Sequence, residues 1–483
     1  MMSAAAGGAQ VVPDDPLSWD GIGAIDAGMN RAALPLPPTQ QGMALPLPDA
    51  DPLHVDVTAD PVLAIARTSD RADLFRQMIG VAVRAAPASL EAQAEGQAAV
   101  AVRAQARSGL FPTIDVQATG YRTLARDFTN DPNTIVERSR GQGRTDATIN
   151  VQQTVVDFGA TSIRIAAAGA RLRAAAAGID ATSDQIALRA IAVWYDLFVA
   201  RALVGLGESF VLSQEQLRDA VGIRVRQGLS APGDVARVDS YLASAEVRLA
   251  GYRRSRADAE ARFAQLLRRP APDQLLRAPL LDARAISRDY AAFAARSTPS
   301  VRSALAQADA ARDDARAALR DTLPTLTAGV QAGRYGFLED VPGYDVRGVV
   351  TVRQRFLGGT NARVNQIRAE AGVADARALR AQEEAARDGA IAWSDVQALT
   401  EQLVAFRRAY IAARQSRDVL SERFAASRGT LFDVLAAQDS FFLAATAYVQ
   451  GVGELDAAHY VLLSRTGRLL PALEIQTAQG TLR

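Results

Sequence analysis

The chain contains no cysteine and no lysine, so all 54 of its basic residues are arginine. Without cysteine there is no disulfide, no thiol nucleophile, no thiolate metal ligand and no cysteine to carry an N-terminal lipid. Without lysine there is no Walker phosphate-binding loop, and neither a G-x-S-x-G elbow nor a dinucleotide-binding glycine pattern occurs. We therefore expect a protein that is not an enzyme and that has no cofactor.

Histidine is scarce as well, with two residues in the chain. His54 lies near three aspartates but has no second histidine nearby, so a solvated loop is a better interpretation than a metal site. His459 is interpreted as an ordinary surface or tunnel-wall residue of the last helix. We expect no metal site and no catalytic triad.

Long hydrophobic runs are also missing. No run of about 18 apolar residues occurs, so we expect no transmembrane helix, and contact with a membrane would require a β-barrel. The start, MMSAAAGGAQVVPDDPLSW, lacks the basic and apolar regions of a secretory signal, which counts against export. The net charge of +1 gives no indication of a nucleic-acid partner.

Proline and glycine are frequent in residues 1–69, which we interpret as an N-terminal extension on or beside the fold. Helical periodicity begins near Asp70. Pro87 should break or kink this first helix, because proline removes a helical hydrogen bond and clashes with the preceding turn.

Two segments after Gly109 alternate with a period of two, as amphipathic β-strands do. In residues 112–123, Ile114 and Val116 alternate with Asp115 and Gln117, and residues 146–157 alternate in the same way. We expect these segments to pair as a hairpin. Their length and composition are typical of transmembrane strands, although a sheet of a soluble protein would look similar.

Residues 160–227 contain no proline and predict one helix on the order of 100 Å long. The turn GLSAPGD then supplies a glycine terminator, and Asp234 can cap the next helix. That returning helix keeps the three-and-four apolar spacing of a coiled coil. The pattern predicts an antiparallel helical hairpin with its tip at residues 226–234.

The same order of elements recurs about 200 residues later, which predicts an internal repeat. Its strands are expected at residues 324–335 and 345–357, and its hairpin tip at 427–433. We therefore predict a mainly α protein with a β-barrel portion, in two repeats of helix, strand, strand, long helix and helix. The predicted domains are the extension 1–69, repeats at 70–272 and 273–472, and a tail at 473–483.

Four strands cannot close a barrel of useful width, and an open sheet edge in lipid would leave backbone groups unpaired at several kcal/mol each. Several copies must therefore share one barrel. Three chains would supply twelve strands, which is enough for an open lumen.

Over roughly residues 70–472, the order of elements and several motifs resemble the TolC family of outer-membrane efflux and secretion channels. The motifs are APASLEAQ, LFPTIDV, VVDFGATSIR, the tip sequence RVRQGLSAPGD and the second tip sequence ERFAASRGTLFDVLAAQD. The resemblance implies a homotrimer with a 12-stranded barrel in outer-membrane lipid and an α-helical tunnel in the periplasm. It also implies two partners, a periplasmic adaptor (membrane fusion) protein and an inner-membrane transporter such as an ABC exporter.

The resemblance implies functional residues too. The tips would dock on the adaptor through Arg226, Gly228, Leu229, Ser230, Arg428, Gly429, Thr430 and Leu431. Asp433 would form a pore constriction of three carboxylates, whereas Ala436 stands where some relatives have a second acidic residue. From the alternation of the strands, we expect Asp115, Gln117 and Arg353 to face the barrel lumen. Arg347, Arg353 and Arg355 could bias that lumen towards anions.

Each of these roles has a structural alternative. Asp433 could serve as an N-cap or first-turn carboxylate. Arg226 and Arg428 could bond the last carbonyls of their helices, and Gly228 and Gly429 could be left-handed helix terminators. Arg355 could lie at the rim of the barrel.

The predicted function is a passive exit duct for type I protein secretion, because SRGTLFDVL and YVLLSRTGRLL look closest to members that serve that pathway. One alternative is a duct for drug or metal efflux. Another, from a different class, is a soluble structural coiled-coil protein.

Overall fold

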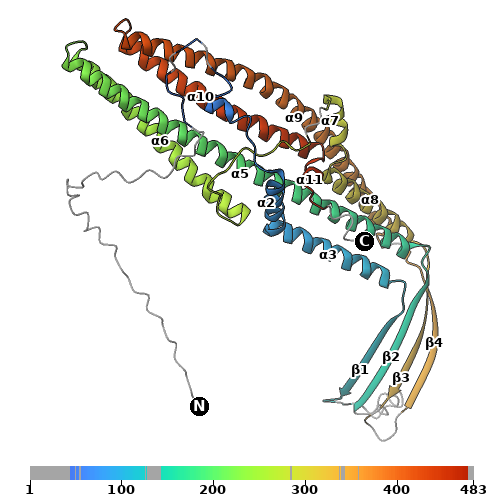
Figure 1. Ribbon diagram of the computed structural model, residues 1–483. Coiled ribbons are helices and arrows are strands. Elements are labelled where there is room, and N and C mark those ends of the chain that lie inside the picture. Colours follow the sequence, from blue (N-terminus) through green and yellow to red (C-terminus); the bar gives the residue numbers. More distant parts are fainter. Residues whose placement is uncertain are drawn as a thin grey trace, which may run out of the picture. The chain divides into compact units, whose positions relative to one another are not determined.

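The computed structural model describes residues 44–48, 51–53, 56–125, 127, 143–282, 286–336, 338, 343–356 and 358–476, which all belong to one compact unit. His54, most of the predicted extension, Leu357 and the end of the predicted tail lie outside the described residues. Within that unit, helices dominate and four strands form one sheet (Figure 1). The predicted mainly α class with a small β portion is confirmed.

The sheet is antiparallel, with the strands in chain order. Its strands are β1 (Thr113–Arg122), β2 (Gly143–Val156), β3 (Thr325–Tyr335) and β4 (Gly343–Arg353). The first repeat supplies β1 and β2, the second supplies β3 and β4, and β2 pairs with β3 across the repeats, with one irregularity between Thr154 and Val156. The sheet is thus shared by both repeats.

In the part of the chain that the structure describes, each repeat carries four main helices, and three of the four have a counterpart of nearly equal length in the other repeat. The first has α2 (Ala72–Ala85), α3 (Pro87–Ser108), α5 (Ala160–Arg226) and α6 (Pro232–Leu267). The second has α7 (Arg288–Ala295), α8 (Pro299–Arg320), α9 (Thr360–Ala425) and α10 (Leu431–Arg465). α3 and α8 both have 22 residues, and the long helices α5 and α9 have 67 and 66.

The predicted break at Pro87 is present. α2 ends at Ala85, and α3 begins at Pro87 with proline in its first turn. Ala86 between them has an extended conformation, with ψ of 133°. Proline disfavours the helical region for the residue before it, which explains both the break and its position.

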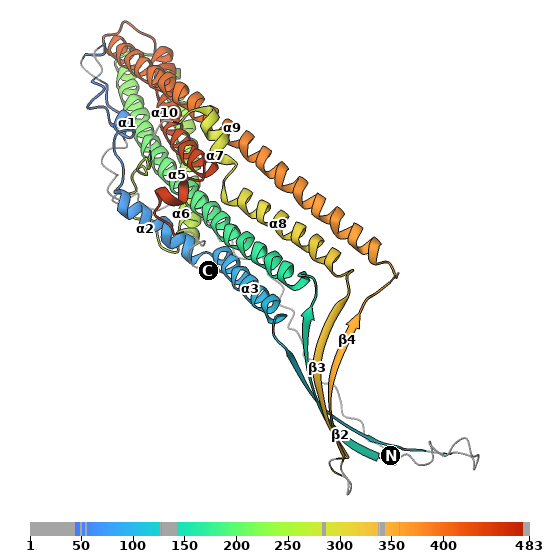
Figure 2. The ribbon, with the colours of Figure 1, turned by 90° about the vertical axis from the view of Figure 1, so that its right-hand side faces the viewer.

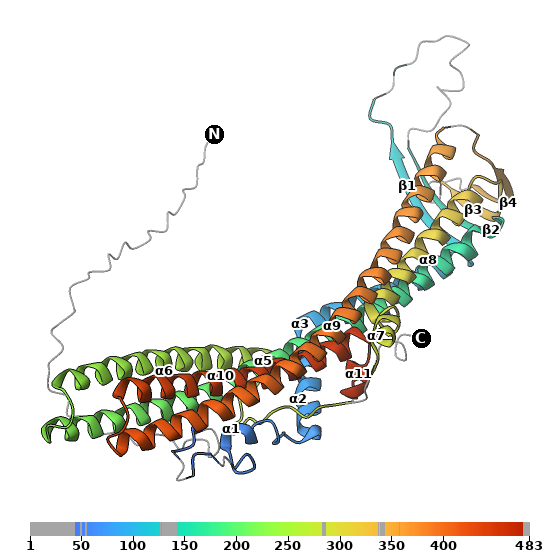
Figure 3. The same ribbon diagram turned by 90° about the horizontal axis from the view of Figure 1, so that it is seen from above.

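The helices of the first repeat lie next to those of the second. α3, α5, α8 and α9 lie side by side in the order of the strands β1 to β4 that they adjoin (Figure 2). On the side away from the sheet, α5 pairs with α6 and α9 pairs with α10 (Figure 3). We propose that residues 272 and 273 separate two sequence repeats. They do not separate two independently packed domains, because α5 of the first repeat packs along α8 of the second.

Most of the core lies midway along the long helices. Trp194 of α5, Phe75 of α2 and Tyr460 of α10 are buried there, and Phe75 packs edge-on against Trp194 with ring centroids 5.2 Å apart. The short helices α1 (Pro61–Ala64) and α11 (Leu469–Ala472) add Val62, Leu63 and Leu469 to this cluster. Segments from both ends of the described chain thereby fasten the middle of the helical part.

The expectation of no transmembrane helix needs correction. α5 contains one 18-residue window that is long and apolar enough to cross a membrane, with a mean hydropathy of 1.5. This window is not an unbroken apolar run, because a segment with a high mean hydropathy can still include one or two charged residues. Since 67% of the window is buried within the structure, α5 is explained as a core helix.

Candidate functional site

The sheet has one polar and one apolar face. Residues directly opposite each other in an antiparallel pair share a face, so the register assigns every strand residue to a side. One row on the polar face runs Asp115, Asn150, Gln331 and Arg347. A row on the other face runs Ile114, Val151 and Val330. The alternation predicted for single strands thus continues across all four.

The three predicted lumen residues lie on the polar face together. Asp115 pairs with Asn150, Gln117 pairs with Thr148, and Arg353 pairs with Thr325 on the opposite edge of the sheet. The structure therefore places them on one side of the sheet, as a common water-filled space would require.

The apolar face of the sheet is largely exposed. Val116 is 74% exposed, Val350 is 71% and Val352 is 68%. Contiguous exposed apolar surface of this kind marks contact with a membrane or another protein. Within the described residues, β1 and β4 also pair on one side only, so each presents a row of unpaired backbone groups to a further strand.

The first hairpin tip ends α5 with a left-handed glycine. Gly228 has φ of +72°, the Leu229 N–H donates to the Arg224 carbonyl at 2.8 Å, and the Gly228 N–H donates to the Val225 carbonyl at 3.0 Å. These are the two bonds of a Schellman motif. The N-cap of α6 is Ala231, and Asp234 lies in the first turn, where its carboxylate accepts from the Ala231 N–H at 3.1 Å. Asp234 thus bonds the helix start from inside the helix and not as the N-cap residue.

The second tip has the same two bonds but a different left-handed residue. α9 ends at Ala425, and Ser427 has φ of +59°. The Arg428 N–H donates to the Arg423 carbonyl at 2.8 Å, and the Ser427 N–H donates to the Phe424 carbonyl at 3.0 Å. The prediction that Gly429 is the left-handed terminator was wrong, because the helix ends earlier than expected.

Asp433 lies in the first turn of α10, behind the N-cap Thr430. The Thr430 hydroxyl accepts from the Asp433 N–H at 3.2 Å and donates to the Asp433 carboxylate at 2.7 Å. The structural alternative for Asp433, a first-turn carboxylate, is therefore present. Its side chain is also exposed, so a pore role remains a proposal.

The predicted docking residues differ in exposure. Leu229 is 59% exposed, and Arg226, Gly228, Arg428 and Thr430 are exposed as well. Ser230 and Gly429 are half-buried.

Leu431 is only 6% exposed, because it packs with Phe424 and Val434 inside the tip. We correct its assignment from a contact residue to a core residue of the tip. The exposed apolar neighbour is Phe432, at 59%, which the sequence analysis missed.

Arg224 is a further tip residue that sequence reasoning missed. Its guanidinium donates to the Phe424 carbonyl at 3.3 Å and to the Ser427 hydroxyl at 3.2 Å, and it lies 4.7 Å from the centre of the Phe424 ring. In the part of the chain that the structure describes, Arg226 and Arg428 make no such bond to a helix end. The carbonyl-capping arginine thus acts between the two hairpins, a contact that periodicity within one helix cannot reveal.

Metal chemistry finds no support in the described part of the chain. No group of three or more histidine, aspartate or glutamate side chains is arranged there to hold an ion. His459 is half-buried, and its Nδ1 lies 2.9 Å from the Leu455 carbonyl of its own helix, as for an ordinary helix residue.

Comparison with known proteins connects these surfaces to a family. Residues 79–268 match the model of the outer membrane efflux protein family. The outer membrane efflux protein BepC of Brucella suis biovar 1 (strain 1330) is 28% identical over 352 residues, which cover 70% of this chain and 75% of BepC. The family match covers the first tip together with strands and helices of the first repeat.

Solved structures show the same fold. The outer membrane protein VceC of Vibrio cholerae matches with a TM-score of 0.70 at 18% identity, over 82% of this chain and 96% of VceC. The Campylobacter jejuni CmeC outer membrane channel matches with a TM-score of 0.71 at 15% identity, over 82% of this chain and 86% of CmeC. This chain is therefore similar in fold to solved outer-membrane channels, and its residues 79–268 are similar in sequence to outer membrane efflux proteins.

Proposed function

We propose that three copies of this chain form one duct through the outer membrane. The observation that carries this proposal is the sheet, which has an exposed apolar face, a polar face and two open edges. If β4 of each copy pairs with β1 of the next, three sheets close into a twelve-stranded barrel. The apolar faces then meet lipid, the polar faces line the lumen, and no edge remains in the membrane.

The hairpin tips are the proposed docking surface for a periplasmic adaptor. Leu229 and Phe432 expose apolar side chains at the two tips, beside Arg226 and Arg428. Apolar anchors surrounded by arginine are common in protein interfaces. The proposed constriction is a ring of three Asp433 carboxylates, one from each copy, because this side chain is exposed beside the second tip.

The proposed cargo is protein delivered by an inner-membrane transporter of the ABC type. The support is the similarity of SRGTLFDVL and YVLLSRTGRLL to members that serve type I secretion. The second candidate is small-molecule efflux, favoured by the name of the relative BepC, an outer membrane efflux protein. Both candidate functions would use the same passive duct, with the same barrel, tips and constriction.

Deletion of the gene, followed by complementation, separates the two candidates. For protein secretion we expect specific proteins to disappear from the culture medium while drug and metal tolerance stays unchanged. The complementing variants are Leu229→Asp and Phe432→Asp at the tips, with Leu212→Asp as a matched exposed control on α5, away from either tip. Loss of drug or metal tolerance with an unchanged set of secreted proteins would instead assign efflux.

A further inference from the structure

A cavity of about 950 Å³ lies where the long helices meet the sheet. Residues from α3, α5, α8 and α9 line it together with the ends of β3 and β4. Arg353 on its wall belongs to the polar face of the sheet, opposite Thr325, which also lines the cavity. The cavity therefore opens on the side of the protein that the proposed duct assigns to its lumen.

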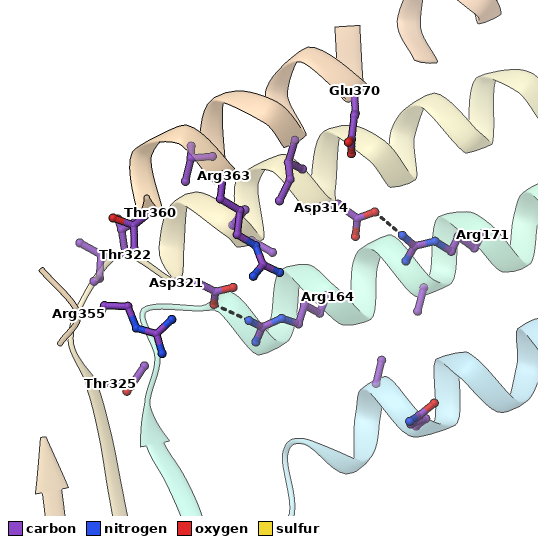
Figure 4. Close-up of a pocket in the computed structure, with 18 of the residues that line it drawn as sticks. Arg164, Arg171, Asp314, Asp321, Thr322, Thr325, Arg355, Thr360, Arg363 and Glu370 are labelled. Carbon is purple, nitrogen blue, oxygen red and sulfur yellow. Dashed lines mark hydrogen bonds and ion pairs between the residues drawn. The ribbon is translucent and has the colours of Figure 1, made fainter. Parts of the chain in front are cut away.

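The charges around this cavity do not balance. Five arginines line it, at positions 164, 171, 353, 355 and 363, but only three acidic residues, at positions 314, 321 and 370. Two of the arginines are neutralised, since Arg164 pairs with Asp321 and Arg171 pairs with Asp314 (Figure 4).

The other three arginines of the cavity are not neutralised in this way. Among the described residues, the guanidinium groups of Arg353, Arg355 and Arg363 form no ion pair or hydrogen bond. Arg355 and Arg363 point towards the space beside the Arg164–Asp321 pair (Figure 4). With Glu370 as the remaining carboxylate, these residues leave a formal charge of +2 in each copy, which is three minus one.

The corresponding junction of the first repeat has a different electrostatic arrangement. Before α5, the carboxylate of Asp157 accepts from the Gly159 N–H at 3.0 Å and from the Thr161 N–H at 2.7 Å. The residue at the same distance before Gly359 is Leu357, so α9 has no carboxylate at the position that corresponds to Asp157. The second junction thus gathers arginines where the first holds a carboxylate.

We propose that Arg353, Arg355 and Arg363 form an oxyanion-binding site, which takes carboxylate or phosphate groups of a solute in the duct. Guanidinium groups match both kinds of oxyanion through paired N–H donors. The proposal rests on the proposed function, because it treats the polar face as the lumen. A trimer would contain three such sites at one level, so a passing anionic solute would meet a positive ring before the barrel.

Titration of inorganic phosphate into the detergent-solubilised full chain, followed by ³¹P line broadening, tests the site. The triple variant Arg353→Gln, Arg355→Gln and Arg363→Gln should bind phosphate at least about tenfold more weakly, since the three side chains are exposed and each exposed ion pair contributes modestly. The matched control replaces Arg320, Arg368 and Arg377, three exposed arginines that are not among the cavity residues, and should bind as the wild type does. Arg363→Gln alone should weaken binding about threefold, as expected for one exposed ion pair, and it carries the test if the triple variant does not fold.

Equal phosphate affinity of the wild type and the cavity variants would overturn the proposal, and so would the lack of broadening by the wild type. Competition with glutarate shows which oxyanion the site prefers. If glutarate displaces phosphate at less than an equimolar concentration, the site prefers carboxylate groups. If displacement requires an excess of glutarate, the site prefers phosphate groups. Conductance of the same preparations in planar bilayers tests the duct separately. Phosphate binding without conductance would contradict the duct and leave the site standing, whereas conductance without phosphate binding would overturn the site alone.

Discussion

Replacement of Asp60 with alanine should release the segment before α2 from the long helix α9. One carboxylate oxygen of Asp60 accepts from the Val62 and Leu63 N–H groups, each at 2.9 Å, and so caps α1. The other accepts from the Arg414 guanidinium at 2.6 Å and from the Tyr410 hydroxyl at 2.8 Å. The Asp60 carboxylate therefore joins the segment before α2 to two residues of α9.

The expected cost follows from burial. Asp60 is 1% exposed and Arg414 is 7% exposed. Removal of one member of a buried ion pair costs about 3–5 kcal/mol, because the remaining charge stays buried without its partner. Loss of the cap contributes to the same total, at about 1 kcal/mol by itself. Asp418, whose carboxylate is 3.8 Å from Arg414 Nε, offsets part of this cost.

Hydrogen exchange of the amides in residues 61–68 measures this local release. A cost of about 3–5 kcal/mol corresponds to exchange about 150- to 4,000-fold faster, provided that exchange proceeds through local opening. Asp56→Ala is the matched control, because its carboxylate bonds the N–H and hydroxyl of Thr58 at an exposed site. Exchange in Asp60→Ala within about twofold of the wild type would refute the reasoning.

Three further changes test packing, backbone strain and burial. Gly389→Ala should destabilise the fold by about 1–3 kcal/mol, since its Cβ would lie 2.8 Å from the Ala291 carbonyl oxygen; an unchanged thermal midpoint would contradict the close packing of α7 on α9. Ser427→Gly should stabilise the fold by about 1 kcal/mol by relieving a left-handed serine, as a higher urea midpoint would show. Burial raises the pKa of Asp184, which accepts from the Ser464 hydroxyl, so the ionised form opposes folding above that pKa and the penalty disappears as pH falls through it. Asp184→Asn should therefore raise the thermal midpoint at pH 8 but not at pH 4; the same gain at both would exclude ionisation as the cause.

Regular elements were predictable because their periods are local. The absence of proline between residues 160 and 227 predicted one helix, and α5 ends at Arg226. The alternation around Ile114 predicted a strand, and β1 runs from Thr113 to Arg122. Pro87 marked a helix start because a proline constrains the residue before it, whatever the tertiary structure. These signals depend on residues that are neighbours in sequence.

The tip contacts were less predictable because they depend on where a helix ends and on what lies across from it. Gly429 looked like a terminator, but packing lets α9 end at Ala425 and places Ser427 in the left-handed region. Arg224 bonds a carbonyl 200 residues later in the chain, which no local pattern contains. The exposed face of the sheet follows from alternation, but its pairing with further copies depends on association.

Imaging of the detergent-extracted full chain by single-particle cryo-electron microscopy tests the central claim most directly. The account predicts a threefold particle in which β4 of each copy pairs with β1 of the next, with Asp115 and Arg353 facing a common lumen. A monomer, a different symmetry, or a particle in which Val116 and Val350 face the lumen would contradict it.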